Sequence, residues 1–201
     1  MDLQLTDRVF VVTGGARGLG RAGADALVAE GARVVMSGRT PDSLEEAVAT
    51  LNASSGREAA VAVLADNADR EAPARLLAAA RDTWGRVDGA LISVGGPPKG
   101  AVTDITDEQW SAAFESVFLG AVRLARELGT ALPEGGSLGL VLSSSVRAPL
   151  PQMAIQRTAA RSCDGRQDAR RGAGSTRGPR QRSAARPDRH RSGRGARRVH
   201  R

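Results

Sequence analysis

The sequence has 201 residues, a length that suits one α/β domain with a substantial hydrophobic core. Its formal net charge of +7 is unevenly distributed: residues 1–156 carry 14 basic and 19 acidic side chains, whereas residues 157–201 carry 15 arginines and three aspartates. A single cysteine, Cys163, excludes an intramolecular disulfide, and no signal peptide or bilayer-spanning apolar run is visible, so we expect a cytoplasmic protein without membrane contact.

Short β-branched runs alternate with stretches of helical spacing along the first 142 residues. We predict strands at 9–12, 33–36, 60–64, 88–94 and 138–142, and helices at 19–30, 40–51, 69–84 and 106–128. Strands and helices that alternate in this way require right-handed crossovers. The predicted fold class is therefore α/β, with a parallel sheet that carries helices on both faces.

This alternation stops after Gln156. Residues 157–201 contain no Leu, Ile, Met, Phe, Trp or Tyr and a single Val, so they cannot bury enough apolar surface to offset the entropy lost on ordering. We therefore predict an ordered domain over residues 1–155 and a disordered Arg-rich tail over residues 156–201.

The tail also has the composition of a GC-rich gene that is translated in the wrong frame. Arg, Ala, Gly and Pro have GC-rich codons, and the tail contains no lysine, whose codons are A-rich. Reading the degenerate codons from their second base permits a further amphipathic helix followed by a strand. We hypothesise a change of frame near Ile155–Gln156, and the coding DNA tests this hypothesis.

A glycine-rich turn joins the first predicted strand to the first helix. Residues 13–20 read TGGARGLG. Glycines permit a tight turn and let backbone N–H groups approach a pyrophosphate, while the helix N-terminus adds partial positive charge. The alternative is an ordinary tight turn, but the position of the motif between a strand and a helix favours binding of a dinucleotide.

These motifs resemble those of the short-chain dehydrogenase/reductase family over residues 5–155. The likeness includes Asp66-Asn67 after the third strand, where the family contacts adenine, Ser93-Val94-Gly95 after the fourth, where it usually has Asn-Ala-Gly, and a serine cluster after the fifth. The resemblance implies a Rossmann-type doubly wound parallel sheet, here truncated after its fifth strand. The expected cofactor contacts are Thr13, Gly14, Ala16, Arg17, Gly18, Leu19, Gly20, Ser37, Arg39, Asp66, Asn67, Ser93 and Gly95.

The residues after the second strand favour NADP(H) over NAD(H). Dehydrogenases that prefer NAD(H) usually place a carboxylate here to hold the ribose hydroxyls. This chain has Ser37-Gly38-Arg39 instead, and Arg17 lies within the glycine-rich turn. Two guanidinium groups beside the ribose suit a 2′-phosphate, which accepts charge-assisted hydrogen bonds. The alternative is that both arginines are solvated surface charges.

Most of the residues that perform the family's reaction are missing. The family uses a serine to position the substrate oxygen, a tyrosine as general acid/base, a lysine that lowers the pKa of that tyrosine, and an asparagine of a proton relay. This chain has no tyrosine, its only lysine is Lys99, and the asparagine position corresponds to Val117 or Phe118. The serine remains as Ser144 or Ser145, for which a polar strand end without a catalytic role is an equal alternative.

Three functions follow from these observations. The first is a nicotinamide-dependent oxidoreductase of small carbonyl or alcohol substrates, impaired by the missing tyrosine and lysine. The second is an NADP(H)-binding protein without catalysis. The third is non-specific binding of nucleic acid or other polyanions through the tail, whose net charge is +12 but which has no aromatic residue for base stacking.

Two further expectations concern metals and assembly. His190 and His200 are the only histidines and have no clustered carboxylates or thiols beside them, so no metal site is expected. The family packs its long helix and the following one into a dimer interface. Loss of the following helix is expected to disrupt the homo-oligomer and to lower solubility by exposing an apolar face that comprises Trp110, Phe114, Val117, Phe118 and Leu124.

Overall fold

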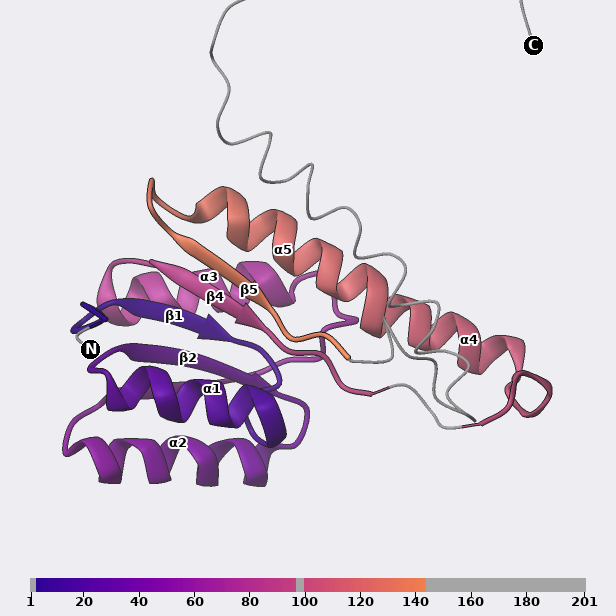
Figure 1. Cartoon of the computed structure of the whole chain (residues 1–201), viewed down its shortest axis with the longest axis horizontal. Helices are drawn as coiled ribbons and strands as arrows, with labels where there is room; N and C mark the ends of the chain where they lie inside the picture. Colours follow the sequence, from indigo (N-terminus) through magenta and orange to yellow (C-terminus); the bar gives the residue numbers. More distant parts are fainter. Residues whose placement is uncertain (1–2, 97–99, 144–201) are drawn as a thin grey trace, which may run out of the picture. The chain divides into compact units, whose positions relative to one another are not determined.

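Five parallel strands form the centre of the computed structural model, which describes residues 3–96 and 100–143 (Figure 1). The strands are β1 (Val9–Val12), β2 (Arg33–Gly38), β3 (Ala60–Leu64), β4 (Gly89–Ile92) and β5 (Ser137–Leu140). They are hydrogen-bonded in the order β3-β2-β1-β4-β5, and each neighbouring pair is parallel. The predicted α/β fold with a Rossmann-type doubly wound sheet is confirmed.

The central strands consist largely of apolar residues because both of their faces are covered. Val11 of β1 lies opposite Val35 of β2 and Ala90 of β4, and both valines are fully buried. By contrast, Ser137 and Leu138 at the start of β5 are exposed. The hydrophobic core is therefore centred on β1, β2 and β4.

Helices cover the sheet on two sides, with α1 and α2 on one side and α3 and α5 on the other (Figure 1). The helices are α1 (Gly18–Ala29), α2 (Pro41–Ser55), α3 (Ala72–Trp84), α4 (Asp107–Ala113) and α5 (Gly120–Ala131), with a short 3₁₀ turn at Val102–Asp104. Leu44 and Leu51 of α2 belong to one buried cluster, together with Val34 and Met36 of β2. Leu76 of α3 belongs to a separate buried cluster, together with Val11 and Leu124. Each fully buried leucine contributes about 1.5–3 kcal/mol to the free energy of unfolding.

The long helix predicted over residues 106–128 is interrupted. Its start is confirmed, since the Thr106 hydroxyl accepts a hydrogen bond from the Gln109 N–H and the Gln109 side chain accepts one from the Thr106 N–H. Between α4 and α5, however, Phe114–Leu119 form a π-helical segment, η2. Wider turns of this kind are often found at functional sites.

The apolar face expected on the long helix is only partly exposed. Phe114 is 45% exposed, in line with the expectation, but Leu124 is fully buried in the core beside α3. Val117 lines a pocket, and Trp110 packs with Ile105 and Ala113. The assignment of Leu124 to an exposed face was wrong, because the inner side of α5 packs on the sheet.

The chain divides into two units, Met1–Asp164 and Gly165–Arg201, and all described residues belong to the first. The predicted tail over residues 156–201 lies outside the described residues, so its disorder stays a prediction. Within the described part of the chain, no helix is both long and apolar enough to cross a membrane.

Candidate cofactor-binding site

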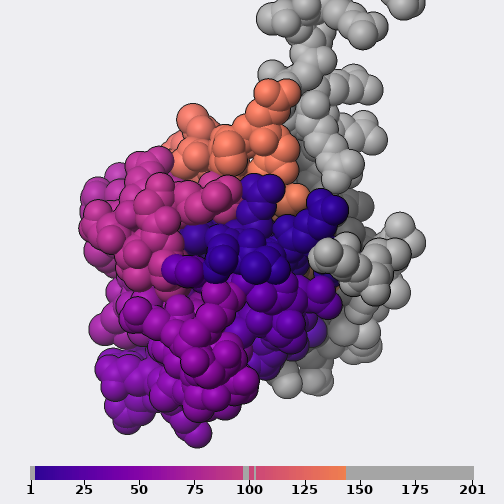
Figure 2. Space-filling model, turned by 90° about the vertical axis from the view of Figure 1, so that its left-hand side faces the viewer, coloured from indigo at the N-terminus to yellow at the C-terminus, as the bar shows by residue number. Residues whose placement is uncertain are grey.

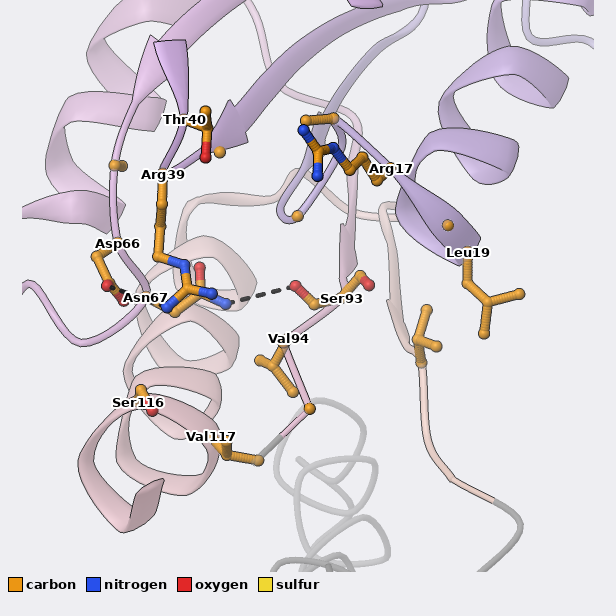
Figure 3. Close-up of a pocket in the computed structure, with 18 of the residues that line it drawn as sticks. Arg17, Leu19, Arg39, Thr40, Asp66, Asn67, Ser93, Val94, Ser116 and Val117 are labelled. Carbon is orange, nitrogen blue, oxygen red and sulfur yellow. Dashed lines mark hydrogen bonds and ion pairs between the residues drawn. The ribbon is translucent and has the colours of Figure 1, made fainter. Parts of the chain in front are cut away.

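A pocket of about 460 Å³ lies at the carboxyl ends of the strands (Figure 3). The pocket opens beside the point where the order of the strands reverses. There the chain leaves β3 at one edge of the sheet and returns as β4 on the other side of β1. Open α/β sheets bind ligands at such a switch point. Most of the predicted cofactor contacts line this pocket: Gly14, Ala16, Arg17, Gly18, Leu19, Arg39, Asp66, Asn67, Ser93 and Gly95.

Thr13 lies beneath the pocket rather than on its wall. It is fully buried, and its hydroxyl donates a hydrogen bond to the Ser93 carbonyl at 2.9 Å and accepts one from the Ser93 N–H at 3.0 Å. This exchange fixes the turn after β1 to the end of β4. Ser37 is also buried behind the wall, where its carbonyl accepts a hydrogen bond from the Gly15 N–H.

Two glycines of the motif at 13–20, one in the turn and one in the first turn of α1, are required by close packing. Gly14 has φ +59°, and a Cβ atom there would lie 2.8 Å from the Ser93 carbonyl oxygen. A Cβ atom on Gly20 would collide with the Gly14 carbonyl. Gly20 therefore does not line the pocket but lets the first turn of α1 pack directly on the loop.

The N-terminus of α1 faces the pocket without a side-chain cap. Arg17 is the N-cap residue, and its side chain accepts no hydrogen bond from the helix. The next residue, Gly18, has φ +58° and no atom within 4 Å of the position that a Cβ atom would occupy. Open space before an uncapped helix start fits a phosphate group, which accepts hydrogen bonds from first-turn N–H groups.

The two candidate arginines come from different elements, Arg17 from the turn before α1 and Arg39 from the segment after β2 (Figure 3). Both are exposed. One guanidinium nitrogen of Arg39 lies 3.9 Å from a carboxylate oxygen of Asp66. A second guanidinium nitrogen of Arg39 lies 3.7 Å from the position that a Cβ atom on Gly95 would occupy. Arg39 therefore extends from the end of β2 towards the segments that follow β3 and β4.

The segment after β3 forms a tight turn on the pocket wall. The carboxylate of Asp66 accepts a hydrogen bond from the Ala68 N–H at 2.9 Å. The side-chain amide of Asn67 donates to the Ser93 carbonyl at 3.4 Å, the contact drawn as a dashed line in Figure 3. Because of this turn, α3 begins at Ala72 rather than at the predicted Asp69.

Several pocket residues were not predicted as cofactor contacts. They are Gly38, Thr40, Ser43, Ala65, Val94, Gly96, Ser116, Val117 and Val141. A signal for Thr40 and Ser43 was available, because hydroxyl residues at the start of a helix directly follow Arg39. Ser116 and Val117 come from η2, whose position depends on tertiary packing.

The described residues include neither of the expected catalytic serines. Ser144, Ser145 and Lys99 lie outside the described residues. Val117, considered above as the position of the family's asparagine, does line the pocket, whereas Phe118 does not. Within residues 3–96 and 100–143, no cluster of three or more His, Cys, Asp or Glu side chains is placed to hold a metal ion.

Relatives of known sequence cover the same part of the chain. It is 32% identical to the uncharacterized oxidoreductase Rv1714 of Mycobacterium tuberculosis (strain ATCC 25618 / H37Rv) over 145 residues, which cover 72% of this chain and 52% of the relative. It is 29% identical to the uncharacterized oxidoreductase YvrD of Bacillus subtilis (strain 168) over 159 residues, which cover 76% and 57%. The chain thus spans about half the length of these relatives.

Two solved structures superpose on most of this chain. L-sorbose reductase from Gluconobacter frateurii, complexed with NADPH and L-sorbose, superposes with a TM-score of 0.75 at 27% identity, over 81% of this chain and 62% of that chain. A short-chain dehydrogenase/reductase from Burkholderia phymatum in complex with NAD gives 0.78 at 21% identity, over 86% and 63%, which supports the fold alone. The short chain dehydrogenase pattern itself matches residues 8–157, and the chain therefore belongs to the short-chain dehydrogenase/reductase family.

Proposed function

We propose that the pocket binds NADP(H), and that the chain carries the nucleotide-binding part of an oxidoreductase for small carbonyl or alcohol substrates. The observation that carries the proposal is the uncapped N-terminus of α1, which faces the pocket beside Gly18 with Arg17 and Arg39 on the rim. Backbone donors and two guanidinium groups together suit a dinucleotide that bears several phosphates.

The pyrophosphate is assigned to the turn between β1 and α1. Gly14 and Gly18 hold this turn in left-handed conformations, and Thr13 anchors it to the end of β4. A rigid turn has its N–H groups oriented before the ligand arrives, so little further ordering entropy is lost on binding.

The preference for NADP(H) is assigned to the segment after β2. The connection between β2 and α2, Arg39-Thr40, contains no acidic residue, and the hydroxyl residues Thr40 and Ser43 also line the pocket. These groups donate hydrogen bonds to a 2′-phosphate, whereas NAD(H) presents only hydroxyls there. Asp66 and Asn67 are assigned to the adenine.

The hydride-transfer step is expected to be impaired. The bound nicotinamide would supply or accept the hydride, but proton transfer to the substrate oxygen needs a group whose pKa is tuned for that task. The chain contains no tyrosine, and Ser144 or Ser145 alone cannot replace a phenol beside an ammonium group. A binding protein without catalysis is the second candidate, favoured by the same absence of tyrosine.

Two titrations of the full chain test the proposal. Protein-bound NADPH is expected to change its fluorescence and to bind at least about tenfold more tightly than NADH, because an additional charged contact contributes more than 1.4 kcal/mol. Tighter binding of NADH would overturn the assigned preference.

Turnover of a panel of small ketones then separates an impaired enzyme from a binding protein. Salt-dependent retention on heparin measures polyanion binding by the tail.

A further inference from the structure

Arg123 on α5 reaches a segment that lies 55 residues earlier in the sequence. Its side chain is only 13% exposed. One guanidinium nitrogen donates to the Ala68 carbonyl at 3.3 Å, and another donates to a carboxylate oxygen of Glu115 on η2 at 2.5 Å. A charge removed from water in this way requires such partners, and the two contacts fix where the guanidinium lies.

Ala68 belongs to the turn that presents Asp66 and Asn67 to the pocket. The Ala68 N–H donates to the Asp66 carboxylate, while the Ala68 carbonyl accepts from Arg123. The guanidinium of Arg123 and the carboxylate of Asp66 are thus joined through the backbone groups of one residue. A shift of Ala68 would change the direction in which the carboxylate of Asp66 points.

The helix also contacts this turn directly. Gly120 is buried at the start of α5, and a Cβ atom there would collide with the Asn67 carbonyl. On the other side, the Asn67 side chain is bonded to Ser93. The turn therefore lies between α5 and the end of β4, and Arg123 is the charged residue of α5 that bonds to it.

We propose that Arg123 is a positioning residue that sets the recognition of adenine by Asp66 and Asn67. The inference rests on the proposed function, in which these two residues contact the adenine. A carboxylate accepts a hydrogen bond from the 6-amino group of adenine but is repelled by the 6-oxo group of hypoxanthine. The ratio of the two affinities therefore reports how well the turn is positioned.

The test compares NADPH with reduced nicotinamide hypoxanthine dinucleotide phosphate on the full 201-residue chain. Dissociation constants come from fluorescence titration, and thermal unfolding is measured in parallel. Arg123→Gln is expected to lower the preference for adenine by about threefold to tenfold, as the weakening of one hydrogen bond implies. Arg126→Gln is the matched control, because Arg126 lies on the same helix, is 66% exposed and pairs only at 3.5 Å with Glu127.

A double variant, Arg123→Gln with Glu115→Gln, removes the partly exposed carboxylate that the single variant leaves without its partner. It is expected to show the same loss of adenine preference as the single variant, because the bond to Ala68 is still missing. Recovery of the preference in the double variant would overturn the positioning role, as would an equal loss of affinity for both nucleotides. If the unmodified chain binds neither nucleotide, the proposed function fails and the inference with it; binding without adenine preference overturns the inference alone.

Discussion

Thr13 and Ser93, 80 residues apart, exchange two buried hydrogen bonds through a single hydroxyl group. The Thr13 Oγ1 atom donates to the Ser93 carbonyl and accepts from the Ser93 N–H. The end of β1 and the end of β4 are thereby held together at the point where the sheet order reverses. The proposed cofactor site depends on these two hydrogen bonds, because the segment after β1 and the segment after β4 both line the pocket.

Replacement of Thr13 by valine is expected to destabilise the chain by about 1–3 kcal/mol, because the buried Ser93 N–H loses its acceptor. The volume is nearly unchanged, so the effect isolates the hydroxyl. Urea denaturation measures the change in the free energy of unfolding. Thr50→Val is the control, since the Thr50 hydroxyl bonds only to the Glu46 carbonyl on the exposed side of α2. Equal effects of the two substitutions would contradict the role given to Thr13.

Gly14→Ala is expected to weaken NADPH binding and to lower stability together. The new Cβ atom would lie 2.8 Å from the Ser93 carbonyl oxygen, so the turn must shift away from β4. Gly56→Ala is the matched control, because Gly56 also has a positive φ, +65°, but has no atom within 4 Å of its Cβ position. The control bears only the left-handed strain of about 1–2 kcal/mol. NADPH affinity measured on both variants separates strain from the collision, and unchanged affinity in Gly14→Ala would count against the assigned turn.

The parallel sheet was predictable because each strand is a short apolar run bounded by turn residues. β1 and β3 begin and end at the predicted residues, and the motif at 13–20 follows β1 directly and includes the first residues of α1. β4 was predicted over 88–94 but runs from Gly89 to Ile92; its end was misplaced because an apolar run carries no sign that Ser93 bonds to Thr13.

The π-helical segment and the contacts of Arg123 could not be predicted from the sequence. Phe114–Leu119 continue the helical spacing of apolar residues without interruption, so the spacing gives no sign of the wider turn. Arg123 has the spacing of an exposed helix residue. Its burial depends on Ala68, which is distant in sequence and becomes its neighbour only when α5 packs beside the turn after β3.

Arg39→Ala is expected to reduce the affinity for NADPH by about tenfold or more and to leave the affinity for NADH nearly unchanged, because only NADPH carries a 2′-phosphate. Both constants are measured by fluorescence titration at fixed salt concentration. Arg81→Ala provides the control, since Arg81 is exposed in the last turn of α3 and does not line the pocket. A parallel loss of NADPH and NADH affinity in Arg39→Ala would place its role elsewhere than at the 2′-phosphate.

A buried carboxylate that is paired with two arginines lies at the opposite end of the sheet, where the strands begin. Figure 2 views the molecule from that end. The carboxylate of Asp88, 6% exposed, accepts hydrogen bonds from the Arg86 and Arg8 guanidinium groups and from the Val9 N–H. Burial raises the pKa of Asp88. The hydrogen bonds from Arg86, Val9 and Arg8 together lower this pKa by more than burial raises it, so the net shift is downward.

The lowered pKa of Asp88 fixes the direction of its pH dependence. Since the folded-state pKa lies below the unfolded value of about 3.9, the carboxylate stabilises the fold fully above that value. The contribution is lost as the pH falls through the folded-state pKa. Asp88→Asn is therefore expected to cost about 1–3 kcal/mol at neutral pH and to flatten the decline in stability below about pH 4.

Asp69→Asn is the control for this comparison. The pKa of Asp69 is also lowered, by the Glu71 N–H and by Arg75, but its side chain is 38% exposed and its ion pair is screened by solvent. Unfolding midpoints measured between about pH 3 and pH 7 should therefore change much less in Asp69→Asn than in Asp88→Asn. Equal changes in the two variants would show that the arginines around Asp88 act as surface charges rather than as partners of a buried carboxylate that joins β1 to β4.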